Sequence, residues 1–373
     1  MPEQNLHIIS FDIPFPANYG GVIDVFYKAK SLADHGLKIH LHCFEYSRKR
    51  NAELEKVFHK VYYYKRDISK KHLFKSVPYI VSSRVSEELI NNLLHDNYPV
   101  LMEGLHTSAL LEDKRFAKRK MVVRAHNIEH EYYHHLAKAE SDIFKKYYYY
   151  NESAKLKRYE ATLEKADALI AISENDKKYF ASEYNNVEFI PAFHPFKEVA
   201  IKEGKGDYIL YHGNLSVAEN INAVKYLVNH VFSDPNIKFK IAGLNPARQI
   251  IKSINGLNNI ELITNPTDKE LQELIADAHI NISITAQATG LKLKLLNTLY
   301  NGRFCLVNDK MLSGTNLDKL CIIANDYGSM KRKINTLFKK EFTQADIEER
   351  KLVLTTLYNN GNNTRKLIDL VCY

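Results

Sequence analysis

Short apolar runs alternate with longer amphipathic stretches along the whole chain. The first half contains six such runs, at Leu6–Ile13, Leu37–Phe44, Val100–Leu105, Met121–Ala125, Ala168–Ser173 and Val187–Pro191. The second half contains six more, at Tyr208–Gly213, Phe239–Gly243, Ile260–Thr264, Ile280–Thr285, Arg303–Asn308 and Leu320–Ala324. Strands that alternate with helices are typical of parallel sheets covered by helices on both faces. The pattern therefore predicts an α/β protein with two successive doubly wound, Rossmann-like domains.

A proline-bounded segment and a polar stretch separate the two halves. We predict an N-terminal domain at 1–191, a linker at 192–207, a C-terminal domain at 208–345 and a helical segment at 346–373 that could cross back to the first domain. Ligands of open α/β sheets bind beyond the carboxyl ends of the strands. Two such domains facing each other across a cleft would hold one ligand each, which suits group transfer between two substrates.

Composition narrows the class of protein. Of the 373 residues, 45% are hydrophobic and 26% are charged, which is an ordinary globular balance. The four cysteines are far apart and form no CxxC pair, which indicates a reducing compartment rather than a disulfide framework. No apolar run approaches the roughly 20 residues that span a bilayer, and the first six residues show no secretory signal. These features predict a cytoplasmic protein.

Positive charge is concentrated in the first half of the chain. Between Tyr46 and Lys75 there are ten Lys and Arg against three acids, and a second basic group lies at 114–120. Basic surfaces attract phosphate groups and anionic lipid headgroups. A solvated face and peripheral contact with the inner face of the membrane are both open interpretations, and we expect no nucleic-acid partner.

Two loops of the first half carry candidate chemistry. Gly20 and Gly21 precede a helix with apolar residues at i, i+3, i+4 and i+7, and glycines there let backbone N–H groups approach an anion. His126 and Asn127 follow the strand Met121–Ala125, where a histidine can donate to a sugar hydroxyl or stabilise developing charge. An ordinary strand-to-helix turn and a structural histidine are the alternatives.

A competing motif follows directly. His130-Glu-Tyr-Tyr-His134 matches HExxH, in which two histidines on one helix face bind zinc beside a glutamate base. Glu152 is a conceivable third ligand. However, the chain contains 16 histidines, so chance matches are common, and the flanking strands indicate a different fold. We therefore predict no metal site.

The second half contains two more loops suited to anions. The segment Tyr211-His-Gly-Asn-Leu-Ser216 ends a predicted strand before a helix at Ile221–Phe232. Farther along, Thr289 and Gly290 are expected to open a helix whose first turn carries Lys292 and Lys294. Lysines at a helix start cost a few tenths of a kcal/mol to about 1 kcal/mol unless an anion binds there. A nucleotide diphosphate would supply that anion, and a solvated lysine pair is the alternative.

Several other chemistries lack their motifs. The chain has no Asp-x-Asp sequence, so metal chelation of a diphosphate is unsupported. It also has no GxxxxGK[ST] loop and no GxGxxG fingerprint, which argues against kinases and dehydrogenases. Lysines and helix dipoles are then the metal-free means of stabilising a leaving group.

Taken in order, these motifs resemble those of the bacterial family-four retaining glycosyltransferases of GT-B fold, over most of the chain. The matching segments are Gly20-Gly21, Glu103-Gly-Leu-His106, Arg124-Ala-His-Asn-Ile-Glu129, Ala166-Asp-Ala-Leu-Ile-Ala-Ile-Ser173, His212-Gly-Asn-Leu with Asn220, and Gly290-Leu-Lys-Leu-Lys-Leu-Leu-Asn297 with Gly302. Each segment alone is a weak signal, whereas six in the family's order are a strong one.

The resemblance implies a metal-independent hexosyltransferase that retains anomeric configuration. The donor would be a UDP- or GDP-linked nucleotide sugar, with no further cofactor. The acceptor would be a glycan or lipid-linked molecule in envelope polysaccharide or glycolipid assembly. The catalytic residues it implies are His126 and Lys294. The implied donor-binding residues are Gly20, Gly21, Gly213, Asn214, Gly243, Thr289, Gly290, Leu291, Lys292 and Asn297, and the acceptor-side residues are Glu103, His106 and Asn127.

One position departs from the family pattern. Asn297 stands where family members carry a glutamate that binds the ribose hydroxyls, and an asparagine there keeps hydrogen bonding but loses the charge. The Arg and Lys pair that some members carry after the Gly-Asn loop is also absent. The alternatives are a nucleotide-sugar epimerase of the same architecture, a catalytically degenerate nucleotide-sugar-binding protein and, more remotely, a zinc hydrolase.

Overall fold

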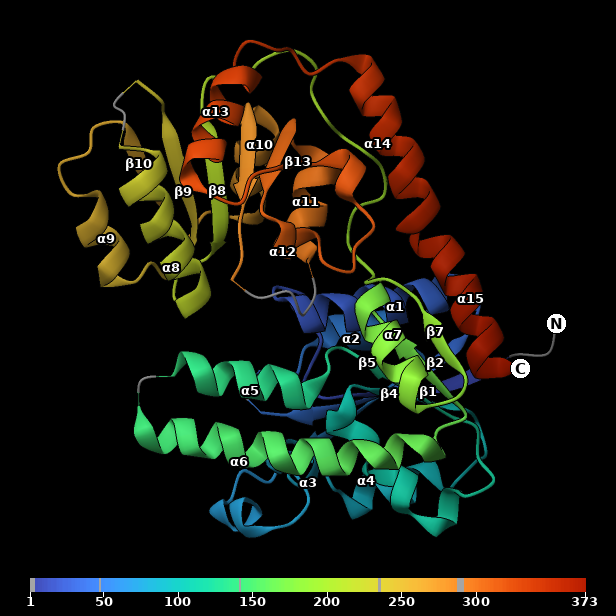
Figure 1. The fold of residues 1–373 in the computed structure, drawn as a ribbon. Coiled ribbons are helices and arrows are strands. Elements are labelled where there is room, and N and C mark those ends of the chain that lie inside the picture. The colour runs from blue at the N-terminus through green and yellow to red at the C-terminus, as the bar shows by residue number, and fades with distance from the viewer. Residues whose placement is uncertain (1–3, 47, 141, 234–235, 287–291) are drawn as a thin grey trace. The chain divides into compact units, whose positions relative to one another are not determined.

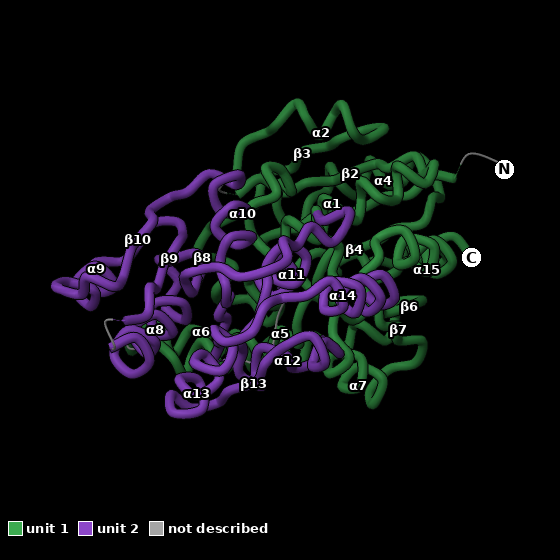
Figure 2. The backbone as a smooth tube through the Cα atoms, turned by 90° about the horizontal axis from the view of Figure 1, so that it is seen from above, with its two compact units in different colours: residues 1–195, 289–291, 358–373 green, residues 196–288, 292–357 purple. Residues whose placement is uncertain are grey.

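The computed structural model describes residues 4–46, 48–140, 142–233, 236–286 and 292–373. The chain forms two compact units, shown in Figures 1 and 2, and each contains one parallel sheet. Unit 1 consists of the described residues of 1–195 and 358–373, and unit 2 of those of 196–288 and 292–357. The C-terminal segment is therefore divided, because α14 (Gln344–Leu357) belongs to unit 2 and α15 (Asn360–Cys372) to unit 1.

Unit 1 is built on a seven-stranded parallel sheet of order β3-β2-β1-β4-β5-β6-β7. Its strands are β1 (Asn5–Ser10), β2 (Lys38–Glu45), β3 (Lys60–Lys65), β4 (Val100–Glu103), β5 (Met121–Ala125), β6 (Ala168–Ala171) and β7 (Val187–Phe189). Strands β4, β5 and β6 are buried at every position. Continuous apolar runs of this kind are expected where helices cover both faces of a parallel sheet.

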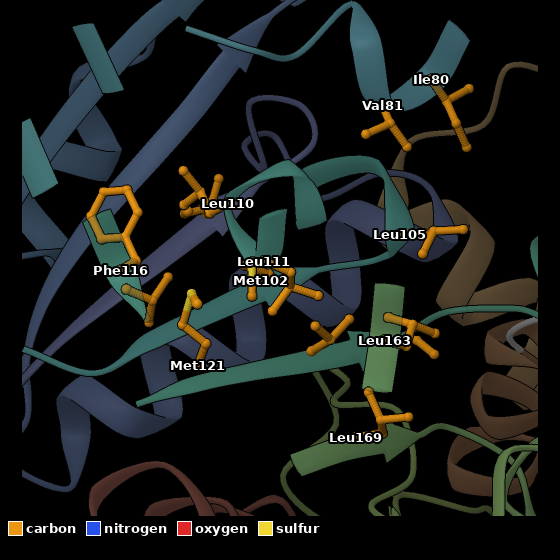
Figure 3. Close-up of a cluster of buried hydrophobic side chains, with 14 of the residues drawn as sticks. Ile80, Val81, Met102, Leu105, Leu110, Leu111, Phe116, Met121, Leu163 and Leu169 are labelled. Atoms are coloured by element: carbon orange, nitrogen blue, oxygen red, sulfur yellow. The ribbon is translucent and has the colours of Figure 1, made fainter. Parts of the chain in front are cut away.

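The helical elements of unit 1 lie between these strands. They are α1 (Gly20–Asp34), α2 (Ala52–Val57), η1 (Lys70–Phe74), α3 (Tyr79–Ser82), α4 (Glu87–Leu93), η2 (Leu105–Glu112), η3 (Lys114–Phe116), α5 (Glu129–Ala139), α6 (Ile143–Tyr159), η4 (Glu160–Lys165) and α7 (Glu174–Glu183). Helix α1 buries Val22, Val25 and Ala29 on one side, as its sequence spacing predicts. On the other face of the sheet, η2 and α3 pack leucine and isoleucine side chains against β4 and β5 (Figure 3).

Unit 2 has a six-stranded parallel sheet of order β10-β9-β8-β11-β12-β13. Its strands are β8 (Ile209–Asn214), β9 (Phe239–Leu244), β10 (Ile260–Thr264), β11 (Ile280–Ser283), β12 (Phe304–Val307) and β13 (Ile322–Ile323). Its other elements are α8 (Ala218–Tyr226), η5 (Leu227–Val231), α9 (Arg248–Ile254), α10 (Asp268–Asp277), α11 (Leu293–Asn301), α12 (Asp309–Leu312), η6 (Asp318–Leu320), α13 (Tyr327–Leu337) and α14. The core fills both faces of this sheet.

The predicted α/β class is confirmed, and all twelve predicted runs form strands. Strand β3 was not predicted, because its tyrosines lie within a lysine-rich segment. The predicted helix at Ile221–Phe232 begins earlier, as α8, and continues as a wider-wound turn to Val231. Among the described residues, no helix is long and apolar enough to cross a membrane.

Candidate functional site

The strand order of each sheet defines where a ligand is expected. In unit 1 the order reverses between β1 and β4, and in unit 2 between β8 and β11. Ligands of open α/β sheets bind outside the carboxyl ends of the strands at such reversal points. In each unit, the predicted site residues that the structure describes lie at or near these ends.

The candidate site of unit 1 contains a buried network of five charged or titratable side chains. Arg124 donates to both carboxylate oxygens of Asp24, at 2.8 and 2.9 Å. The Nζ of Lys28 lies 3.1 Å from Asp24 and 2.7 Å from Glu103. The Nε2 of His126 lies 2.9 Å from Oε2 of Glu103. All five residues are buried, and the ion pairs satisfy one another rather than facing solvent.

The cations of the network keep its carboxylates ionised. Burial alone would raise the pKa of Asp24, but Arg124 and Lys28 outweigh burial and hold this pKa well below its ordinary value. Burial likewise opposes ionisation of Glu103, and Lys28 and His126 lower its pKa overall. His126 therefore lies against a carboxylate that stays charged, which orients its ring.

The same network contains the kinds of side chain that bind metals. Among the described residues, Asp24, Glu103 and His126 form the one group of this type, with ligand atoms within 4.8 Å of one another. However, the Lys28 ammonium lies between the two carboxylates, and the Arg124 guanidinium forms an ion pair with Asp24. Protein cations thus already fill the positions that a metal ion would take.

The network also fixes the end of the first sheet. Arg124 donates to the carbonyl oxygens of Ile190 and Pro191, both at 3.0 Å, and the N–H of Phe193 donates to Asp24 at 2.8 Å. These bonds tie the segment after β7 to α1 and β5. Glu103, which was assigned to the acceptor side, is fully buried, so any influence on a ligand would pass through His126.

The remaining predicted residues of unit 1 surround this network. Gly20 is the first residue of α1, and a Cβ at Gly21 would lie 2.8 Å from Cζ of Phe11. A side chain at this position would therefore require the ring of Phe11 to shift. The ring of His126 meets Phe11 edge-on at 5.4 Å between centroids. Asn127 is half-buried and hydrogen-bonds the carboxylate of Glu129.

A second titratable pair lies next to Phe11. Nδ1 of His106, the predicted acceptor-side histidine, lies 3.9 Å from Oε1 of Glu129. Burial, with Arg84 as the next cause, lowers the pKa of His106 well below its ordinary value. Burial raises the pKa of Glu129 to about 7. Neither of these two buried atoms has a hydrogen-bond partner among the described residues.

Sequence reasoning missed Glu129, Arg84 and Arg66 as members of this region. Glu129 ends the motif that begins at Arg124, but the sequence alone does not indicate that it belongs to the site. Arg84 and Arg66 are buried arginines, which is rare for unpaired charges. In the sequence they appear as part of a generally basic half, and only the fold shows that they turn inward.

In unit 2, Lys294 occupies the equivalent position at the reversal point. It is the second residue of α11, and its Nζ lies 3.3 Å from Oδ1 of Asn220 and 5.4 Å from the Tyr211 ring centroid. Burial lowers the pKa of Lys294, while Glu219 acts in the opposite direction. Asn220 also accepts from the Tyr211 hydroxyl at 2.9 Å. A half-buried cation next to mainly neutral groups at a helix start is suited to an anionic ligand.

The loop after β8 is built around the same asparagine. Asn220 donates to the carbonyl of Asn214 at 2.9 Å, and Asn214 accepts from the backbone and hydroxyl of Ser216. A Cβ at Gly213 would lie 3.2 Å from Asn220, and one at Gly243 would lie 1.8 Å from the Gly213 carbonyl. Only glycine fits at Gly243, so this residue allows β8 and β9 to place their ends close together.

The lysine and asparagine positions of α11 have different surroundings. Lys292 directly precedes the helix, which begins at Leu293. Thr289, Gly290 and Leu291 lie outside the described residues. The Oδ1 of Asn297 accepts from Nδ2 of Asn301 at 2.9 Å. His212, near this helix, is buried with a pKa lowered to about 4 by burial and by Lys294, and it lies 3.4 Å from Oγ1 of Thr298.

The HExxH segment forms part of α5, but its side chains are engaged elsewhere. His130 Nδ1 lies 3.0 Å from Oε2 of Glu160. The ring of His134 packs against Tyr150 of α6 at 5.4 Å. Glu152, the conceivable third ligand, accepts from the N–H of Tyr79 and from Lys155. These contacts give the motif a packing role between α5 and its neighbours.

Comparisons with known proteins agree with this architecture. The chain is 30% identical over 341 residues to the "uncharacterized 44.6 kDa protein in cps region" of Klebsiella pneumoniae, covering 86% of this chain and 87% of the relative. No family model matches the chain.

Solved structures also resemble the whole chain. A glycosyltransferase from Rickettsia africae matches with a TM-score of 0.65 and 12% identity, covering 100% of this chain and 98% of that one. Anabaena HepE, solved in complex with UDP and glucose, matches with a TM-score of 0.66 and 10% identity over 99% and 100% of the two chains. At these identities the likeness establishes the fold, which is that of the two-domain GT-B proteins.

Proposed function

Since the chain belongs to the family of the Klebsiella pneumoniae cps-region protein and has the GT-B fold, we propose that it is a glycosyltransferase of polysaccharide assembly. The donor is a nucleotide sugar and the acceptor a glycan or a lipid-linked glycan. Two kinds of similarity support this proposal. The cps-region relative supports a role in polysaccharide assembly, and the glycosyltransferase structures support sugar transfer as the reaction.

Lys294 is the observation that carries the proposal. A half-buried ammonium at the start of α11, at the strand-order reversal of unit 2, gains most from a ligand with concentrated negative charge. A nucleoside diphosphate fits that description, and it is the leaving group of sugar transfer. A positive charge held there would stabilise the diphosphate as the glycosidic bond breaks.

Retention and metal independence are further parts of the proposal. Lys294, Lys292 and the backbone N–H groups that begin α11 would take the charge-neutralising role that a metal ion has in other transferases. In unit 1, His126 would act at the donor sugar. Glu103 would orient its ring through the 2.9 Å contact, and Lys28 would keep Glu103 charged.

The test is a nucleotide-binding titration of the full chain by calorimetry, with UDP, GDP, ADP and TDP in the presence of EDTA. One nucleotide is expected to bind, and Lys294→Met is expected to weaken its affinity by about tenfold or more, since charge-assisted bonds are worth about 1.5–3 kcal/mol. Lys252→Met, which removes an exposed lysine of α9 in the same unit, is the matched control. Equal affinity in both variants, or no binding of any nucleotide, would refute this role.

A degenerate binding protein is the second candidate, favoured by Asn297. Its side-chain oxygen already accepts from Asn301, so it is less available to a ribose hydroxyl than a carboxylate would be. Nucleotide binding without release of nucleoside diphosphate from any matching sugar donor, with a cell-envelope extract as acceptor, would favour this candidate over the transferase.

Contact with an anionic membrane surface is also proposed, on the basis of exposed apolar side chains among lysines. Phe144 and Tyr147 at the start of α6 are 87% and 74% exposed, and Phe74 of η1 is 88% exposed. Exposed lysines flank both positions, and η1 is tied to α6 because Lys155 donates to the Leu73 carbonyl at 2.8 Å. Aromatic rings next to lysines suit the headgroup region of a bilayer.

Vesicle flotation tests this contact. The protein should float with vesicles containing anionic lipid and not with neutral vesicles, and Phe144→Ser should reduce the bound fraction. Leu352→Ser, at a 71% exposed residue of α14, is the control and should leave flotation unchanged. Equal flotation of both variants would show that the α6 surface is not the contact.

A further inference from the structure

Two buried arginines at the ligand-binding edge of unit 1 form no ion pair with any residue that the structure describes. Arg84 and Arg66 are 7% and 9% exposed. Among the residues that the structure describes, no carboxylate forms an ion pair with either guanidinium. Buried arginines are ordinarily paired, and an unpaired one carries a large desolvation cost. The pair therefore needs an explanation beyond packing.

The protein holds both side chains firmly. Nε and Nη1 of Arg84 donate to the carbonyls of Phe11 and Ile80, at 2.9 and 2.7 Å. Nε of Arg66 donates to the hydroxyl of Ser83 at 3.0 Å, and its guanidinium lies 4.5 Å from the Tyr46 ring centroid. Within the described chain, Nη2 of Arg84 and both terminal nitrogens of Arg66 have no hydrogen-bond partner. Five donors in a fixed plane are thus only partly used.

The two arginines also repel each other. Burial, followed by the charge of Arg66, lowers the pKa of Arg84 to about 9. Both arginines contribute to the lowered pKa of His106, whose ring lies 5.3 Å from that of Phe11. Because Phe11 follows β1 and His106 follows β4, the positive charge lies at the reversal point of the sheet.

The nearby carboxylic acids offset this charge only in part. Asp12 accepts from the N–H of Ile13 at 2.8 Å and from the Tyr19 hydroxyl at 3.3 Å, and burial raises its pKa. Glu129 has a pKa of about 7, so it is only partly ionised at neutral pH. The region therefore retains net positive charge, with two arginines held ready to donate.

We propose that Arg66 and Arg84 form an oxyanion-binding site for the acceptor, and that the acceptor carries a carboxylate or phosphate group near the hydroxyl to be glycosylated. Planar guanidinium groups bind both kinds of oxyanion through paired hydrogen bonds. The Tyr46 ring, on a residue that is 59% exposed, offers a face for the sugar itself. This inference rests on the proposed function, since it specifies the acceptor class of that same site.

The test is calorimetric titration of the full chain, without nucleotide, with glucuronate, glucose 6-phosphate and glucose. The first two probes distinguish a sugar carboxylate from a phosphate. At least one is expected to bind about tenfold more tightly than glucose, as charge-assisted bonds imply. Arg66→Gln keeps a donor for Ser83 but removes the charge, and it should abolish this preference. Arg84→Lys, which loses the planar fork, should weaken binding of the same anion.

Arg115→Gln is the matched control, because Arg115 is an exposed arginine of unit 1 that pairs with Asp113. It should leave all three affinities unchanged. If neither anion binds more tightly than glucose, or if Arg66→Gln and Arg115→Gln act equally, the inference is overturned. The affinities of the protein for UDP and GDP, measured separately, distinguish a failure of this inference from a failure of the proposed function. If a nucleotide binds but neither anion binds more tightly than glucose, only the proposed acceptor class is refuted. If an anion is preferred but no nucleotide binds, the proposed glycosyltransferase function is refuted and the anion-binding site remains.

Discussion

The buried charges of the two units differ in how completely they are paired. In unit 1, Asp24, Lys28, Glu103 and Arg124 form a closed network in which every charge lies within 3.1 Å of an opposite one. In unit 2, Lys294 is half-buried, and among the described residues its Nζ lies 3.3 Å from the neutral side chain of Asn220 rather than against a carboxylate. Both regions lie at the reversal point of a parallel sheet.

This difference separates two uses of a buried charge. A network whose charges cancel has little to gain from a ligand, and its loss would leave a buried charge uncompensated. It therefore holds structure in place, here the segment after β7 and the ring of His126. A buried cation without an anion is poorly stabilised in the ligand-free protein and gains from binding one. The pairing of buried charges thus distinguishes the supporting residues from those that meet the substrate.

The strongest test of the comparison is to break the closed network at its centre. Asp24→Asn removes the carboxylate that accepts from Arg124, Lys28 and the N–H of Phe193. Arg124 then loses its carboxylate partner and Lys28 keeps only Glu103, so we expect a loss of ~3–5 kcal/mol in the free energy of unfolding. Thermal and urea unfolding followed by circular dichroism would measure it.

Asp34→Asn is the control for that substitution. Asp34 also pairs with a lysine of α1, Lys30, but the carboxylate is 60% exposed. Exposed pairs contribute about 0–1 kcal/mol, so this variant should unfold nearly as the original protein does. A comparable small loss in both variants would show that the unit 1 network is not a supporting element.

The next test concerns Glu129, a buried acid that forms no ion pair with a lysine or arginine among the described residues. Its pKa of about 7 in the folded protein exceeds the ordinary value of 4.5. The folded state therefore keeps a proton that the unfolded state releases, and this contribution to stability is full below pH 4.5 and lost as the pH rises toward 7. Glu129→Gln should stabilise the protein by less than about 1 kcal/mol at pH 5 and by about 3 kcal/mol at pH 8.

Melting temperatures of the original protein and the glutamine variant, measured from pH 5 to pH 8, would check this. Glu131→Gln supplies the control, because that glutamate lies on the same helix and is half-buried. A constant difference between original and Glu129→Gln across the pH range would mean that Glu129 is ionised in the folded state, and the site would then carry less positive charge than we infer.

The sequence contained enough information for the fold, because the fold depends on local patterns. Twelve apolar runs, separated by helical spacing, determine two parallel sheets, and glycines such as Gly243 mark where strand ends approach closely. Strand β3 escaped prediction because its edge position leaves three of its residues half-buried and flanked by lysines. Without the fold, the sequence of this strand is typical of a solvent-exposed surface.

The site was only partly predictable, for a physical reason. His126, Lys294 and the Gly213 loop follow strands or begin helices, and such positions can be recognised from local spacing. The partners that decide their chemistry come from distant segments, as with Asp24 and Arg124, which are 100 positions apart. Whether a charge is paired depends on these long-range contacts. For this reason Arg84 and Glu129 emerged only from the fold.

The smallest expected effect concerns Lys294 in the ligand-free protein. Burial lowers its pKa below the unfolded value of 10.5, so holding the charged form costs stability at neutral pH, and this cost is relieved as the pH rises toward 10.5. Lys294→Met fills similar volume without charge, and the Tyr211 hydroxyl still donates to Asn220. We expect an unfolding free energy that is unchanged or up to about 1 kcal/mol higher than in the original protein.

A saturating nucleoside diphosphate should reverse that order. The ligand stabilises the folded state according to its affinity, by about 2.7 kcal/mol at a hundred times its dissociation constant, and the methionine variant would gain less at the same concentration. Melting temperatures of the original protein and of Lys294→Met, with and without the nucleotide that binds in the titration, would show this reversal. If the Lys294→Met variant is less stable than the original protein without ligand, the charge of Lys294 is already stabilised by its neighbours. The contrast with the unit 1 network would then fail.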